Sequence, residues 1–155
     1  MFVERSGDYL YLWGSLATGM YLARKRLETV DDLASCEYLV AAPTPSRPDV
    51  VPHWSKDFAP TAMLFDCVPN EMSAAYNPHL RQYVAFRSLY RESNIVNRTA
   101  PQITGPWSDP QIVYAPARVK DDDLIYATKE HPELAAEAAA CCLSRTSTPR
   151  LTSRR

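Results

Sequence analysis

Residues 71–114 repeat a pattern of short apolar runs separated by turn residues. Runs of about 5 residues, spaced about 8–12 residues apart with Asn, Gly, Pro and Asp between them, are typical of antiparallel strands. The pattern predicts four consecutive strands, at Met72–Tyr76, Gln82–Arg87, Asn94–Thr99 and Gln111–Tyr114. Four strands in a row form one blade of a β-propeller, so the segment indicates an all-β meander.

An earlier group of strands precedes this segment. The predicted strands are Tyr9–Trp13, Met20–Arg24, Cys36–Val40 and, as an outer strand, Thr61–Phe65. The alternating rings of the first of these strands favour a packed β face, with a platform for a ligand as the alternative. Residues 121–128 predict the first strand of a third group.

Two stretches depart from the strand pattern. Residues 41–60 contain five prolines, which lack the amide donor and fix φ, so the sequence predicts a loop without regular structure. Residues 135–155 are rich in alanine and then in Ser, Thr and basic residues, which predicts a short helix or disorder. The expected division is therefore a fold over residues 1–134 and a tail over 135–155 outside it.

Composition narrows the classes of partner. The 155 residues carry a formal net charge of -1, which argues against nucleic acid and against an anionic membrane surface. No apolar run approaches the ~20 residues of a spanning helix, and the first residues do not read as a signal peptide, so the location is left open. Only four glycines occur and no Gly-rich phosphate loop, so no cofactor is expected.

The cysteines give no metal site. They stand at Cys36, Cys67, Cys141 and Cys142, without a C-x-x-C pair or a Cys/His cluster at zinc spacing. We interpret them as free thiols, with a Cys36–Cys67 disulfide as the alternative.

Several short motifs occur together in a fixed order. They are Tyr11-Leu12-Trp13-Gly14, Met20-Tyr21-Leu22-Ala23-Arg24, Glu71-Met72-Ser73, Tyr76-Asn77-Pro78, Arg98-Thr99-Ala100, Thr104-Gly105-Pro106-Trp107-Ser108, and Tyr126 with Lys129-Glu130-His131-Pro132-Glu133-Leu134. Over residues 8–134 the chain resembles the family called domain of unknown function 4185. The resemblance implies a five-bladed β-propeller similar to family 43 and related glycoside hydrolases. It also implies that some bacterial members of the family are endo-acting D-arabinanases. Five blades need nearly twice this length, so we predict a partial propeller of about two blades and the start of a third.

Hydrolysis of a glycosidic bond requires two carboxyl groups that flank it. Glu71 begins the predicted innermost strand of its blade, which favours a role in sugar binding or acid catalysis in the central channel; a surface glutamate is the alternative. Its partner is not identifiable, since Asp66 and Asp109 are candidates by residue type only.

Three further residues are candidates for substrate binding. Arg98 would hold a sugar hydroxyl or Glu71, or else pair with a carboxylate on another strand. His131 would lie at the channel mouth or be structural. Trp54, in the proline-rich loop, is a better candidate for stacking on a sugar than Trp107, which we expect to pack against its blade.

The sequence thus predicts a glycoside hydrolase-like domain of carbohydrate processing that is incomplete and inactive as this chain. A non-catalytic carbohydrate-binding module and a remnant without function are the alternatives. The expected partner is a polysaccharide or oligosaccharide. Self-association through exposed strand edges is also expected.

Overall fold

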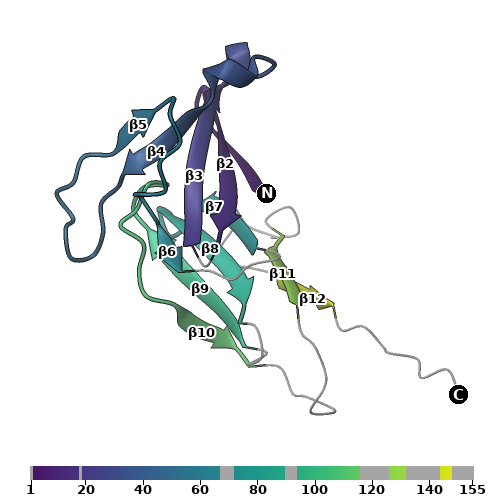
Figure 1. Ribbon diagram of the computed structural model, residues 1–155. Helices are drawn as coiled ribbons and strands as arrows, with labels where there is room; N and C mark the ends of the chain where they lie inside the picture. The colour runs from purple at the N-terminus through teal and green to yellow at the C-terminus, as the bar shows by residue number, and fades with distance from the viewer. Residues whose placement is uncertain are drawn as a thin grey trace, which may run out of the picture.

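Antiparallel β-sheets make up almost all of the regular structure in the computed structural model (Figure 1). It describes residues 2–17, 19–66, 72–89, 94–115, 126–131 and 144–147. No α-helix occurs in these ranges, and the two helical turns, η1 (Leu27–Thr29) and η2 (Leu33–Ser35), are of the 3-10 type. The mostly β architecture predicted from the sequence is confirmed.

The first sheet has the strand order β1-β2-β3-β4-β5, with β6 also paired to β3. Its strands are β1 (Phe2–Ser6), β2 (Tyr9–Leu16), β3 (Gly19–Arg26), β4 (Glu37–Ala41), β5 (His53–Ser55) and β6 (Phe65–Asp66). β1 and β2 form a tight hairpin in which Ser6 pairs with Tyr9. Gly7 connects them with a φ of 58°, a conformation in which most other residues are strained.

β2 and β3 are longer than the predicted strands Tyr9–Trp13 and Met20–Arg24, and three further details of this sheet differ from the sequence prediction. β1 was not expected. β5 lies inside the proline-rich crossing, where no regular structure was predicted, because His53–Ser55 falls between prolines and its free amides pair with β4. The outer strand was expected at Thr61–Phe65, but the observed strand, β6, contains only Phe65 and Asp66, which pair with β3.

The second sheet is a four-stranded meander in the order β10-β9-β8-β7. Its strands are β7 (Met72–Asn77), β8 (Gln82–Ser88), β9 (Ile95–Ala100) and β10 (Gln111–Tyr114). All four were predicted, with bounds that differ by one residue at most. β10 is an edge strand whose residues are all exposed.

A third, two-stranded sheet consists of β11 (Tyr126–Glu130) and β12 (Ser144–Ser147). β11 lies against β7 and β8, and the backbone N–H of Glu130 donates to the Ser73 hydroxyl at 2.7 Å. The strand at Ser144–Ser147 differs from the helix or disorder expected for the tail. The predicted helix at 135–143 lies outside the described residues, so the division at residue 134 stays a prediction.

The core joins the first sheet to the second. Alternation along β2 and β3 turns Trp13, Met20 and Leu22 to one face, where they meet Met72, Ala74 and Ala85 of the second sheet. Trp13, Phe65 and Trp107 form an aromatic group at this contact, with ring centres 5.4 to 6.3 Å apart. Trp107 therefore packs between the sheets, as the sequence predicted.

Candidate functional site

A group of aromatic and charged side chains continues the inner face of the first sheet beyond the core. The register places Tyr9, Tyr11 and Trp13 on one side of β2, opposite Arg26, Arg24 and Leu22 of β3. Whereas Trp13 is buried against the second sheet, the residues nearer the hairpin are only half-buried. We define the arginine–aromatic cluster as Tyr9, Tyr11, Arg24, Glu37 and Trp54.

Arg24 is the centre of this cluster. Its Nε donates to Oε2 of Glu37 at 2.7 Å, because β3 and β4 pair with these residues opposite each other. Its guanidinium carbon lies 4.5 Å from the ring centre of Tyr9 and 4.2 Å from that of Trp54, a geometry in which the cation is attracted to both rings. The side chains of Arg24 and Glu37 are 21% and 33% exposed, so the ion pair is partly open to solvent.

Tyr11 lies beside this arginine at the inner border of the cluster. Its ring centre is 6.0 Å from that of Trp54. Burial raises the pKa of the Tyr11 hydroxyl above the ordinary value of 10.0, and this effect outweighs the positive charge and the hydrogen bond of Arg24, which lower the pKa. Tyr11 therefore stays neutral in the folded protein at a pH where an exposed tyrosine ionises.

This shift predicts a loss of stability at alkaline pH. A raised pKa in the folded state means that the unfolded chain loses its proton first, so the stabilising contribution is complete below about pH 10 and declines as the pH rises toward the folded pKa. Tyr11→Phe is expected to make urea unfolding less sensitive to pH across this window. Tyr114→Phe, at an exposed position, is the matched control; an equal change in both variants would contradict the prediction.

Arg98 is held by structural contacts between the sheets. Its side chain is 9% exposed; Nη2 donates to Oδ1 of Asp66 at 2.6 Å, and Nη1 donates to the Ser108 carbonyl at 2.7 Å. The guanidinium also lies 5.2 Å from the centre of the Phe65 ring. Of the roles weighed for Arg98, the structure shows the pairing with a carboxylate on another strand, and this carboxylate is Asp66.

The other sequence-predicted residues lie apart from the cluster or outside the described part of the chain. His131 follows β11 directly and is half-buried, next to the Glu130 amide that bonds Ser73 at the start of β7. Glu71 lies outside the described residues. Trp54 alone among the four candidates belongs to the arginine–aromatic cluster, so a common site for all four stays a prediction.

We did not predict Arg24 or Glu37 as site residues from the sequence. The alternation of Tyr9 and Tyr11 left a ligand platform open, but the arginine and the glutamate meet them only through the pairing of three strands. Opposite charges on two predicted neighbouring strands were the only signal available.

In the described ranges, no group of three or more His, Cys, Asp or Glu side chains is arranged to hold a metal ion. No described helix has the length and hydropathy needed to cross a bilayer. Cys36 is a free thiol.

The fold and the cluster define a mostly β protein of stacked antiparallel sheets. The family described as "Domain of unknown function (DUF4185)" matches residues 1–148, and the chain belongs to this family. Among solved structures, it resembles a "putative hydrolase" from Bacteroides ovatus, with a TM-score of 0.55 and 15% sequence identity. The similarity covers 83% of this chain but spans only 33% of the hydrolase chain, and at this identity it shows the fold alone. No curated protein matches the sequence.

Proposed function

We propose that this chain is a carbohydrate-binding domain of glycoside hydrolase-like β-propeller architecture, and that it binds a saccharide at the arginine–aromatic cluster without cleaving it. The observation that carries the proposal is Arg24, which lies between the Tyr9 and Trp54 rings and is bonded to Glu37. Aromatic rings beside charged donors and acceptors suit a sugar, which has apolar ring faces and a rim of hydroxyl groups.

The arrangement of the sheets supports the propeller part of the proposal. The second sheet is a four-stranded antiparallel meander, the form of one blade, and the three sheets stack in sequence order. The first strand of the second sheet, β7, contacts both β1 and β11. This contact fits blades that meet along their first strands.

The two carboxylates that are bound by arginine do not form a catalytic pair with each other, which supports a non-catalytic role of the cluster. Glu37 lies opposite Arg24 of β3, and Asp66 lies opposite Gly19 of β3. Arg24 and Gly19 are five positions apart along this strand. At about 3.3 Å per residue, the two positions are roughly 16 Å apart. Catalytic carboxyl pairs in glycoside hydrolases are about 5–9.5 Å apart, so these two cannot act on one bond.

Trp54 provides the test of this proposal. Wild-type protein is screened against arabinan, related furanose polymers and a glycan array, and calorimetry then measures the affinity for the saccharides that bind. Trp54→Ala is expected to weaken binding at least tenfold, about 1.4 kcal/mol, because it removes the surface for stacking. Trp54→Phe should restore part of the affinity.

Tyr114→Ala is the matched control, because it removes an exposed aromatic ring from β10, on a different sheet. It should bind like the wild type. A reducing-sugar assay on the same polymers should detect no cleavage. Absence of any binding saccharide, or equal losses in Trp54→Ala and Tyr114→Ala, would contradict the proposal, and release of reducing ends would contradict its non-catalytic part.

A further inference from the structure

The aromatic side chains of the arginine–aromatic cluster continue onto the second sheet. The hydroxyl group of Tyr83, on β8, is hydrogen-bonded to Oγ of Ser6 at 3.0 Å, and Ser6 is the residue that pairs with Tyr9 at the β1–β2 hairpin. Tyr83 also lies opposite Tyr76 of β7, and the centres of these two rings are 5.3 Å apart. The contact between the sheets therefore brings two further rings next to the cluster.

These rings follow one another from the first sheet to the second. Trp54, Tyr11 and Tyr83 are half-buried and pack against the same core, and the centres of the first two rings are 6.0 Å apart. Burial has the largest effect in raising the pKa of Tyr11, and the nearby Tyr83 hydroxyl raises this pKa further, so these two tyrosines are neighbours. We define the aromatic row as Trp54, Tyr11, Tyr83 and Tyr76, in this order. Tyr76, at its end, is 46% exposed.

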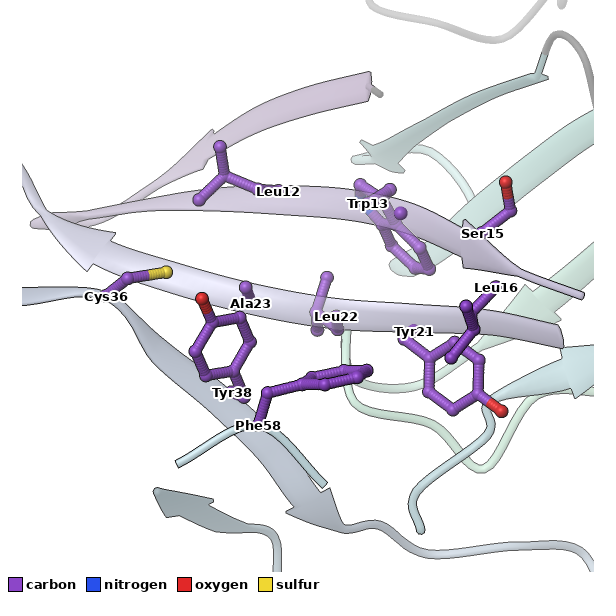
Figure 2. Close-up of a pocket in the computed structure, with 11 residues that line it drawn as sticks. Leu12, Trp13, Ser15, Leu16, Tyr21, Leu22, Ala23, Cys36, Tyr38 and Phe58 are labelled. Atoms are coloured by element: carbon purple, nitrogen blue, oxygen red, sulfur yellow. The ribbon is translucent and has the colours of Figure 1, made fainter. Parts of the chain in front are cut away.

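The opposite face of the first sheet offers a different kind of surface. Figure 2 shows the rings of Tyr21, Tyr38 and Phe58 gathered along one side of β3, where Phe58 contacts the other two rings edge-on. The residues that line the hollow at this face are uncharged. It therefore lacks the charged donors and acceptors that Arg24 and Glu37 provide beside the aromatic row.

We propose that the aromatic row binds an extended saccharide chain, with Trp54 and Tyr76 stacked on different sugar units. This inference rests on the proposed function and adds that the ligand is a polymer or a long oligosaccharide. A sugar chain presents one apolar ring face after another, which suits a series of aromatic rings. Translational and rotational freedom is lost only once on binding, so each further unit that stacks increases the affinity.

Calorimetry with arabino-oligosaccharides of about two to about eight units, or with the equivalent series from another polymer that binds in the screen, tests this proposal. The affinity of the wild type should rise at least about tenfold along the series. Tyr76→Ala should bind the longest member at least about fivefold more weakly and the shortest binding member like the wild type, because a short ligand at Trp54 does not reach Tyr76. Trp54→Ala should weaken binding at every length.

Tyr114→Ala is the matched control, because Tyr114 is an exposed tyrosine on the edge strand β10, and it should bind like the wild type at every length. Tyr76→Phe keeps the ring and should keep the dependence on length, and circular dichroism checks the fold of each variant. An affinity that is independent of length, or a wild-type affinity of Tyr76→Ala for the longest member, would overturn this inference and leave binding at Trp54 intact. Equal losses of Tyr76→Ala for short and long members would overturn it too, because the change would then act through the fold. Absence of any binding saccharide would overturn the proposed function and this inference with it.

Discussion

Replacing Trp13 with alanine is expected to lower the free energy of unfolding by about 3–5 kcal/mol. The Trp13 side chain is 1% exposed, and its ring lies 5.5 Å from that of Trp107 and 6.3 Å from that of Phe65. Its removal would leave a cavity at the contact between the first two sheets. Since small domains are stable by only about 5–15 kcal/mol, the variant should be close to unfolding at room temperature.

Urea denaturation followed by tryptophan fluorescence and circular dichroism measures this loss. Leu33→Ala is the control, because Leu33 is an apolar residue that is 87% exposed, and its stability should match the wild type. A Trp13→Ala loss below about 1 kcal/mol would mean that the two sheets are not held together at this aromatic group.

Replacing Arg98 with alanine is expected to cost about 2–4 kcal/mol of stability. The change removes the ion pair with Asp66, the bond to the Ser108 carbonyl and the packing on Phe65. This loss is smaller than the largest losses seen when a fully buried ion pair is broken. The reason is that the Asp66 side chain is 73% exposed, so water can solvate it when its partner is lost.

A double-mutant cycle with Asp66→Ala isolates the pair from the packing. We expect a coupling energy of about 1 kcal/mol between the two positions. Glu37→Ala provides the comparison, since Arg24 is more exposed than Arg98, 21% against 9%, and its ion pair should contribute under about 1 kcal/mol. A coupling near zero for Arg98 and Asp66 would contradict the structural role assigned to this arginine.

The strands of the second sheet were predictable because their signals are local. Alternation and turn residues such as Asn77 and Pro78 act within a few positions of each strand, and the structure follows them closely. β1 gave a weaker signal, because only Phe2 and Val3 of its five residues are apolar, although Gly7 and Asp8 mark the turn that follows it. β5 gave no such signal, because the prolines around it favour a loop.

The candidate site was less predictable because it depends on register between distant strands. Trp54 was identified as a stacking residue, but its neighbour Arg24 lies on β3, and Glu37 on β4. Nothing in the spacing of these residues reveals that they meet. An ion pair between Arg98 and a carboxylate was one of the roles predicted from the sequence. The identity of the carboxylate, Asp66, could not be predicted, because it depends on how the two sheets contact each other.

Each of the first two sheets is a single uninterrupted stretch of the polypeptide, within residues 2–66 and 72–114. No strand of one is inserted into the other, and a single connection joins them. A gene rearrangement that copied or deleted either stretch would therefore add or remove a whole layer and leave every remaining hydrogen-bonded ladder intact. The architecture is therefore suited to evolutionary change in the number of its sheets. A newly added sheet would have to pack against aromatic residues such as Trp13 and Trp107, which form the contact between the present two sheets.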